Sequence, residues 1–301
     1  MIVVTTPTGG IGRQVLDNLL GSGTDLRVVA RNLDDIPADI RQRVEVIQGS
    51  HGDGAVIEKA FDGADAVFWL TPPDPHAESV EAAYVGFTRP AAEALRNRAV
   101  KRVVGVTALG RGTPWASRAG YVAGSLAMDD LIASTGVAYR ALTNPSFMDN
   151  MMRQAEAIRS QGMFFSPIDG DRKLPYVATR DIAAAAARLL LDDAWTGVSG
   201  VPLLGPEDLS NNDMAEIISE VLGKPVRFQQ ITFEAYKDRF VSFGMTDAMA
   251  QGMTDMAWTK NEGLDNAVQR TPANSTPTSF RQWSEEVLKP AVLGLAPAAS
   301  S

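Results

Sequence analysis

The feature that most constrains the fold of this sequence is a glycine-rich turn near the N-terminus. An apolar run, IVVT at residues 2–5, is followed at once by TPTGGIG at residues 6–12. Three closely spaced glycines permit a tight turn in which no side chain blocks the backbone N–H groups that open the next helix. A strand, a turn and a helix in this order predict the first unit of a parallel α/β sheet, with a dinucleotide diphosphate at the helix N-terminus.

The residues expected to hold the diphosphate are those of the turn itself: Thr6, Thr8, Gly9, Gly10, Ile11 and Gly12. The turn departs from the usual GxxGxxG pattern at its first position, where Thr6 replaces glycine, so the backbone there must accept a Cβ. A glycine-rich turn without any ligand is the alternative interpretation.

The end of the second apolar run indicates which dinucleotide is bound. Enzymes that use NAD carry an acid there for the ribose hydroxyls, whereas this chain has Arg31 and Asn32. A guanidinium can hold the 2′-phosphate of NADP through two parallel hydrogen bonds. The predicted cofactor is therefore NADP(H). A strand-end arginine that only faces water is the alternative, and Arg13 is a second candidate for the phosphate.

Short apolar runs alternate with amphipathic stretches over the first half of the chain. Six buried parallel strands are predicted, at residues 2–5, 26–30, 44–48, 66–70, 102–107 and 138–143. Helices are predicted between them, at residues 12–20, 80–98 and 128–134. The predicted fold class is α/β, a Rossmann-type doubly wound parallel sheet with a smaller C-terminal substrate lobe.

The rhythm changes after residue 144. The sequence predicts a helix at residues 151–160, a Phe-rich turn at residues 163–167, a helix from about residue 181 and a strand at residues 226–231. Ser210 and Asp213 form a capping-box pattern before a helix that Gly223 ends. The predicted domains are an NADP-binding domain at residues 1–150, to which residues 176–204 return, a substrate lobe at residues 151–175 and 205–295, and a disordered tail at residues 296–301.

Composition excludes several classes of function. The net charge is −8 with scattered Lys and Arg, which argues against nucleic acid or an anionic membrane as the partner. Cysteine is absent, which rules out disulfides and thiolate chemistry, and no metal site is expected. The chain opens without a signal-peptide pattern and contains no apolar run long enough to span a bilayer. We expect a cytoplasmic protein, monomeric or homodimeric, that acts on a small molecule.

Several segments, taken in order, resemble the NmrA-like atypical short-chain dehydrogenases/reductases. They are LRVVARN at residues 26–32, LTPP at 70–73, STGVAYRAL at 134–142, NPSFMDN at 144–150 and GPEDLS at 205–210. This resemblance implies cofactor contacts in three places: Leu70, Thr71 and Pro72 at the ribose, Pro145, Ser146 and Phe147 at the nicotinamide, and Ser50 near the adenine. His51 would also lie near the adenine, without a catalytic role, and a solvated loop position is the alternative for it.

The wider superfamily uses a Ser/Thr after the fifth strand and a Tyr-x-x-x-Lys on the next helix. Thr107 and Tyr121 match the first two places, but Ser125 stands where lysine is expected, and no lysine occurs between Lys101 and Lys173. The predicted catalytic residues are thus Thr107, Tyr121 and Ser125, with the acid/base relay incomplete. Water, Tyr121 or the substrate itself would then supply the proton.

Aromatic and methionine side chains cluster in the substrate lobe and suit a flat apolar ligand. The predicted substrate-binding residues are Phe147, Met148, Met151, Phe164, Phe165, Met245 and Met249, with core packing as the alternative for each. The predicted function is an NADPH-dependent reductase of an aromatic polycyclic ketone, similar to polyketide-tailoring ketoreductases of antibiotic biosynthesis. A quinone reductase and a non-catalytic NADP-sensing regulator are the alternatives.

Overall fold

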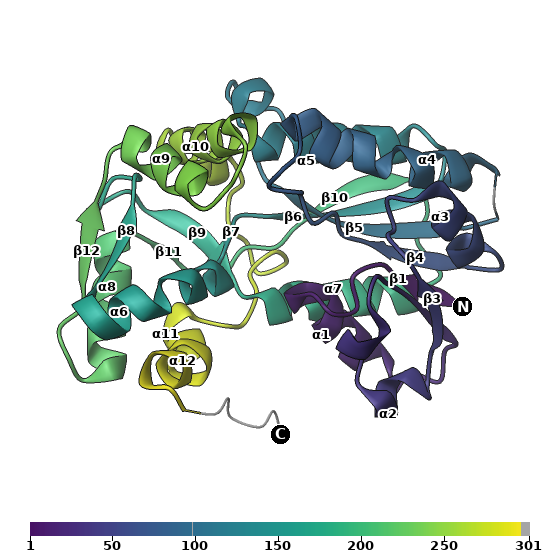
Figure 1. Ribbon diagram of the computed structural model, residues 1–301, viewed down its shortest axis with the longest axis horizontal. Coiled ribbons are helices and arrows are strands. Elements are labelled where there is room, and N and C mark those ends of the chain that lie inside the picture. The colour runs from purple at the N-terminus through teal and green to yellow at the C-terminus, as the bar shows by residue number, and fades with distance from the viewer. Residues whose placement is uncertain (98, 296–301) are drawn as a thin grey trace. The chain divides into compact units, whose positions relative to one another are not determined.

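The computed structural model describes residues 1–97 and 99–295, which divide into two compact units (Figure 1). The first unit comprises residues 1–108, 124–143 and 182–201, and the second comprises residues 109–123, 144–181 and the chain from residue 202 onward. The tail predicted at residues 296–301 lies outside the described residues. In the described part of the chain, no helix is both long and apolar enough to cross a membrane.

A seven-stranded sheet with the order β10-β6-β5-β4-β1-β2-β3 forms the centre of the first unit. Its strands are β1 (Ile2–Val4), β2 (Leu26–Ala30), β3 (Glu45–Gln48), β4 (Ala66–Trp69), β5 (Arg102–Ala108), β6 (Ala138–Asn144) and β10 (Val198–Pro202). The pairs from β3 through β2, β1 and β4 to β5 are parallel. The six predicted strands are confirmed in position, each within one residue at either end. The burial predicted for all six is wrong for β3, an edge strand whose residues are half-buried or exposed.

Helices cover both faces of this sheet (Figure 1). On one face lie α3 (Gly54–Phe61), α4 (Phe87–Asn97) and α5 (Tyr121–Ala133), whose apolar residues pack on Val3, Val67 and Val103. On the other lie α1 (Gly10–Leu19) and α7 (Thr179–Leu191), and the short α2 (Ala38–Arg41) follows β2. Strands β1, β2 and β4 are buried along their whole length, which explains the unbroken apolar sequences of β1 and β4. Arg27 interrupts the apolar run of β2, and its buried guanidinium pairs with Glu45 on β3.

The second unit holds two small sheets and a set of helices. The sheets are β11-β9-β7 and β12-β8, formed by β7 (Ser146–Phe147), β8 (Met163–Ser166), β9 (Leu174–Val177), β11 (Asp208–Leu209) and β12 (Arg227–Gln230). The helices are α6 (Ala155–Gln161), α8 (Asn211–Leu222), α9 (Phe233–Ser242), α10 (Asp247–Asn261), α11 (Phe280–Trp283) and α12 (Lys289–Leu293).

The Phe-rich turn predicted at residues 163–167 is wrong, because residues 163–166 form strand β8. The strand pairs in parallel with β12, which follows more than sixty residues later in the chain. Phe164 is 1% exposed, and its ring centroid lies 5.5 Å from that of Phe228 on the partner strand. A run of three apolar residues does not by itself distinguish a turn from a strand, and the pairing partner that decides it is remote in sequence.

The capping box is confirmed. Ser210 accepts a hydrogen bond from the Asp213 N–H at 3.0 Å, and the Asp213 carboxylate accepts one from the Ser210 N–H at 2.8 Å. Gly223 ends α8 in the left-handed conformation, with φ 65°. The cap fixes the start of a helix that carries much of the core of the second unit.

Replacing this cap should destabilise the protein measurably. Ser210→Ala leaves the part-buried N–H of Asp213 without its acceptor and should lower the free energy of unfolding in urea by about 1 kcal/mol. Ser242→Ala is the matched control, because the Ser242 hydroxyl only donates to the Arg239 carbonyl within α9. Equal effects of the two substitutions would contradict the assigned role of the cap.

Candidate functional site

The turn between β1 and α1 is held by a contact that only glycine permits. A Cβ at Gly12 would lie 1.9 Å from the Thr6 carbonyl oxygen and 2.5 Å from the Thr6 hydroxyl. The Gly9 N–H donates to that carbonyl oxygen at 3.1 Å and leads into the helix in an extended conformation. The first turn of α1 is therefore packed directly on the residue that follows β1.

The N-terminus of α1 is open toward a ligand. No side chain caps it, whereas α3, α8, α9 and α10 are capped by Asp53, Ser210, Thr232 and Thr246. A Cβ at Gly10 would meet nothing within 4 Å, and the Thr6 hydroxyl is buried without a hydrogen-bond partner among the described residues. Free N–H groups, empty space and an unsatisfied hydroxyl are what a bound diphosphate requires.

The end of β4 lies beside this turn, as the strand order dictates. The Leu70 N–H donates to the Thr5 hydroxyl at 3.3 Å, and that hydroxyl donates to the Phe68 carbonyl at 3.0 Å. Thr71 is 4% exposed, and its hydroxyl contacts Thr88 and donates to the Met128 sulphur. The Thr71 side chain is thus turned into the interior, while Pro72 is exposed.

The end of β2 presents one free cation. Arg31 is exposed, and its guanidinium has no hydrogen-bond or ion-pair partner in the part of the chain that the structure describes. The Asn32 amide is occupied, since it accepts from the Asp34 N–H at 3.2 Å and donates to Asp35 at 3.1 Å. Arg31 is therefore the side chain here that is available to a phosphate.

Between these loops lies a buried histidine. The solvated position considered for His51 is wrong, because the residue is 7% exposed and its ring packs edge-on against Trp69 and Phe87. Its Nε2 lies 3.0 Å from the Leu70 carbonyl oxygen. Burial, with a smaller contribution from the charge of Arg31, lowers the pKa of His51 to about 4, although the hydrogen bond that the ring donates to the Leu70 carbonyl opposes this shift. The imidazole is neutral and structural. Ser50, the preceding residue, accepts from the Gly52 N–H at 3.2 Å.

Two of the three predicted catalytic residues meet in a buried polar network. The Thr107 and Ser125 hydroxyl oxygens are 2.8 Å apart, and Thr107 donates to the Asp129 carboxylate at 2.7 Å. Tyr139 donates to the other oxygen of that carboxylate at 2.5 Å. Sequence reasoning missed Asp129 and Tyr139, although Asp129 lies one helical turn after Ser125 on the same face of α5.

Tyr121 belongs to the second unit, and its hydroxyl lies 3.9 Å from the sulphur of Met245. It is 8% exposed. Where a short-chain dehydrogenase would carry lysine, the Ser125 hydroxyl bonds to Thr107 instead. The structure therefore places hydroxyls and a carboxylate around Thr107.

A cavity of about 480 Å³ in the second unit gathers five of the predicted substrate residues. Phe147, Met148, Met151, Phe164 and Phe165 line it, together with Ser146, Met253 and Met256 and with residues that were not predicted, among them Tyr236 and Phe240. Pro145, which precedes them, is buried. Met249 is fully buried elsewhere in this unit, and neither it nor Met245 lines the cavity.

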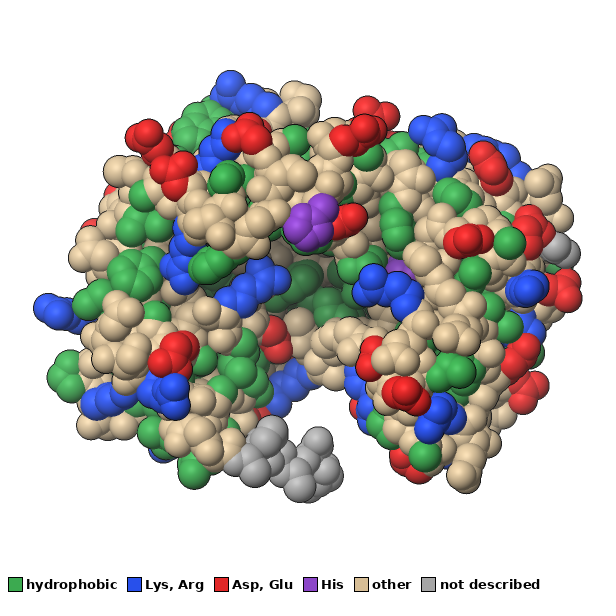
Figure 2. All heavy atoms as spheres, viewed as in Figure 1, with side chains coloured by type: hydrophobic (Ala, Val, Ile, Leu, Met, Phe, Trp, Pro, Cys, Tyr) green, Lys and Arg blue, Asp and Glu red, His purple; other side chains and the backbone are tan. Residues whose placement is uncertain are grey.

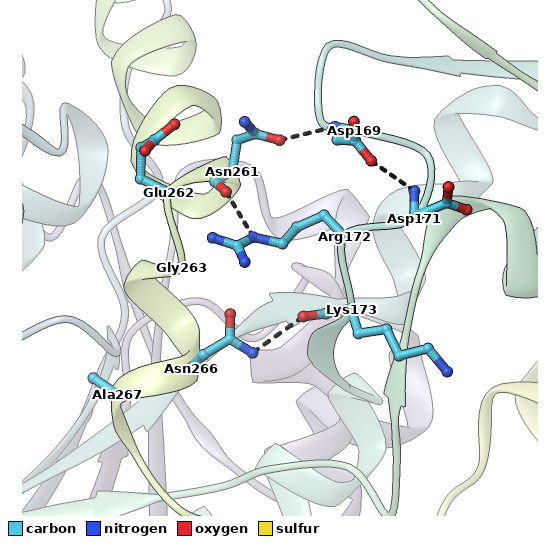
Figure 3. Close-up of a pocket in the computed structure, with 9 residues that line it drawn as sticks. All are labelled: Asp169, Asp171, Arg172, Lys173, Asn261, Glu262, Gly263, Asn266 and Ala267. Carbon is cyan, nitrogen blue, oxygen red and sulfur yellow. Dashed lines mark hydrogen bonds between the residues drawn. The ribbon is translucent and has the colours of Figure 1, made fainter.

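A second hollow in the same unit, of about 760 Å³, has a different character (Figure 3). Its walls carry Asp169, Asp171, Arg172, Lys173, Asn261, Glu262 and Asn266. These groups largely bind one another: the Asn261 side chain accepts from the Asp169 N–H, the Asn261 carbonyl accepts from Arg172, and Asn266 donates to the Lys173 carbonyl. Mixed charge and satisfied polar groups make it a poor site for an apolar ligand.

Charges elsewhere are dispersed. Figure 2 shows acidic and basic side chains interspersed over the face in view, without a broad patch of one sign. Among residues 1–97 and 99–295, no cluster of three or more His, Asp or Glu is placed to hold a metal ion.

The first unit is a dinucleotide-binding domain, as its strand order and its open helix start define it. The family model described as NAD(P)H-binding matches residues 7–193, and the model of the NmrA-like family matches residues 131–285. The chain therefore belongs to the NmrA-like family of NAD(P)H-binding proteins, and the predicted family is confirmed.

Similar proteins of known activity cover most of the chain. It is 29% identical over 294 residues to a (4-alkanoyl-5-oxo-2,5-dihydrofuran-3-yl)methyl phosphate reductase of Streptomyces griseus, covering 95% of this chain and 97% of that one. It is 27% identical over 256 residues to an NAD(P)H azoreductase of Xenophilus azovorans, covering 85% and 86%. An NADPH-dependent quinone oxidoreductase of Escherichia coli, solved with NADPH, superposes with a TM-score of 0.76 at 22% identity, covering 94% and 98%.

Arg31 should decide between the two pyridine nucleotides. Arg31→Gln removes the charge-assisted hydrogen bonds to a 2′-phosphate and should weaken NADPH binding about 10- to 100-fold, while NADH binding stays unchanged. Calorimetric titration with each nucleotide measures both affinities. Arg41→Gln, a change in an exposed arginine of α2, serves as the control. An equal loss for both nucleotides would remove Arg31 from 2′-phosphate recognition.

The buried neutral His51 should make stability fall in mild acid. The unfolded chain takes up a proton at this residue below about pH 6.5, whereas the folded protein does so only near pH 4. Between these values the unfolded state binds more protons, so the free energy of unfolding drops by up to about 3 kcal/mol as the pH falls from 6.5 to 4. The difference between wild type and His51→Gln in urea denaturation at each pH isolates this contribution. Parallel pH curves for the two proteins would contradict it.

Proposed function

We propose that this protein is an NADPH-dependent reductase whose acceptor is a quinone or a similarly electron-poor conjugated molecule. The observation that carries the proposal is the open N-terminus of α1. There the glycine turn, the free N–H groups and the unsatisfied Thr6 hydroxyl are suited to bind a diphosphate. The predicted class of NAD(P)H-dependent oxidoreductase agrees with the relatives, which are an azoreductase, a furanone phosphate reductase and a quinone oxidoreductase.

Different residues of the chain bind different parts of the cofactor and the acceptor. The turn and the first turn of α1 hold the diphosphate, and Arg31 holds the 2′-phosphate. NADPH, when bound, supplies a hydride, which is one proton and two electrons, and becomes NADP⁺. The aromatic and methionine walls around Phe147 and Phe165 bind a flat acceptor by dispersion and exclude water from it.

The incomplete proton relay favours a quinone over a simple ketone. Hydride transfer to a ketone leaves an alkoxide, a strong base that requires a positioned acid in the transition state. Hydride transfer to a quinone leaves a phenolate, whose conjugate acid has a pKa of about 10, as tyrosine has. Water can protonate that oxygen later, so the overall reaction consumes NADPH, one proton and the quinone and yields NADP⁺ and the hydroquinone. The polycyclic ketone predicted from the sequence stays a prediction.

The decisive experiment follows oxidation of NADPH by the full-length protein with two acceptors of similar size, 2-methyl-1,4-naphthoquinone and 1-tetralone. We expect turnover with the quinone and a rate at least about 100-fold lower with the ketone, because general acid catalysis is missing. The absorbance of the reduced nicotinamide is the readout. A faster ketone reaction would support the predicted ketoreductase instead.

Tyr121 tests the proton step. Because its hydroxyl is directed at Met245, Tyr121→Phe should keep quinone reduction within about twofold of wild type. Complete loss of turnover with intact NADPH binding would identify Tyr121 as the proton donor. NADPH binding without oxidation by either acceptor would overturn the reductase proposal and favour a cofactor-sensing protein.

A further inference from the structure

The aromatic cavity of the second unit carries positive charge without negative charge. Arg153, Arg239 and Lys260 are among its lining residues, and no Asp or Glu is. Lys260 is neutralised, since its ammonium forms a buried ion pair with Asp265. Two guanidinium groups are therefore left uncompensated beside walls that are mostly aromatic and thioether.

The two arginines come from different elements, and the charges of both influence the same residue of the cavity wall. Arg153 lies on the 3-10 turn Met148–Gln154, and Arg239 lies on α9. Burial raises the pKa of Tyr236, and the charges of both arginines oppose that rise, so both fields reach the same phenol on the cavity wall. The Arg239 guanidinium also lies 5.7 Å from the centroid of the Phe243 ring.

Neither guanidinium has a carboxylate partner among the described residues. Other arginines of this unit are paired, as Arg180 is with Glu286 and Arg281 is with Glu220. Arg239 is half-buried and Arg153 is exposed, so water screens the attraction of an anion to Arg153 more than the attraction to Arg239.

We propose that this cavity selects acceptors that carry an anionic substituent, a sulfonate, carboxylate or phosphate, on a flat apolar body, and that Arg153 and Arg239 determine this specificity. The inference rests on the proposed function for the role of the ligand as an acceptor. The phenyl and thioether walls hold the body, and the guanidinium groups hold the anion through charge-assisted hydrogen bonds. Both arginines act in binding, so they set KM and leave the hydride step to the cofactor site.

A pair of isosteric ligands tests the charge without any turnover. Naphthalene-2-sulfonate and the neutral naphthalene-2-sulfonamide have the same body and nearly the same outline. Calorimetry with NADP⁺-saturated wild-type protein should give about tenfold tighter binding of the sulfonate. Arg153→Gln and Arg239→Gln should each weaken sulfonate binding about fivefold, leave sulfonamide binding within about twofold, and together abolish the preference.

The controls separate charge recognition from general damage. Arg159→Gln removes an exposed arginine that pairs with Glu156 on α6 and should change neither affinity. Unchanged NADPH binding by each variant shows that it is folded. In wild type, raising the salt concentration should reduce the preference for the sulfonate, a readout that needs no variant.

Equal affinity of wild type for the two ligands, or a preference that survives the double substitution, would overturn the inference. Its failure is distinguishable from that of the proposed function. Absence of NADPH oxidation with any quinone would refute the reductase, whereas the sulfonate preference would still be measured directly. With turnover present, KM for 1,4-naphthoquinone-2-sulfonate should rise in both arginine variants while kcat stays within about twofold.

Discussion

The contact between Gly12 and the Thr6 carbonyl oxygen is the constraint on which the cofactor site depends. It holds the start of α1 against the residue after β1, so that the free N–H groups of the helix lie at the carboxyl edge of the sheet. Because β1 lies between β2 and β4, that edge also receives Arg31 from one neighbour and Leu70 from the other. The strand order and the close packing of Gly12 on Thr6 thus bring three separate segments to one edge of the sheet.

The two units use different physical means of recognition. In the first, the proposed cofactor site consists mainly of backbone groups, fixed by buried strands that allow little adjustment. In the second, the cavity consists of side chains, with aromatic rings, thioethers and two unpaired guanidinium groups. A family can therefore keep one cofactor while its members differ in acceptor, since changing a cavity side chain leaves the backbone of the diphosphate site untouched.

The sequence was most informative where one local rule sufficed. Buried parallel strands, the glycine turn and the Ser210 capping box depend on neighbours in the chain, and their predicted positions are confirmed. It failed where the partner is distant: β8 is defined by β12, and His51 is buried by Trp69 and Phe87. Asp129 was not predicted for the same reason, because Thr107 and Tyr139, which donate to it, lie on separate strands. Met249 was predicted to bind substrate but is buried in the interior, because apolar composition does not reveal which face of a helix borders a cavity.

The methionine content of the cavity has a consequence of its own. Met148, Met151, Met253 and Met256 contribute unbranched, polarizable side chains that change rotamer at small cost, unlike the β-branched residues of the central sheet. A cavity lined by such side chains adapts to ligands of different shapes and discriminates poorly among them by shape. One cavity can therefore accept ligands of different shapes and still select among them by their charge.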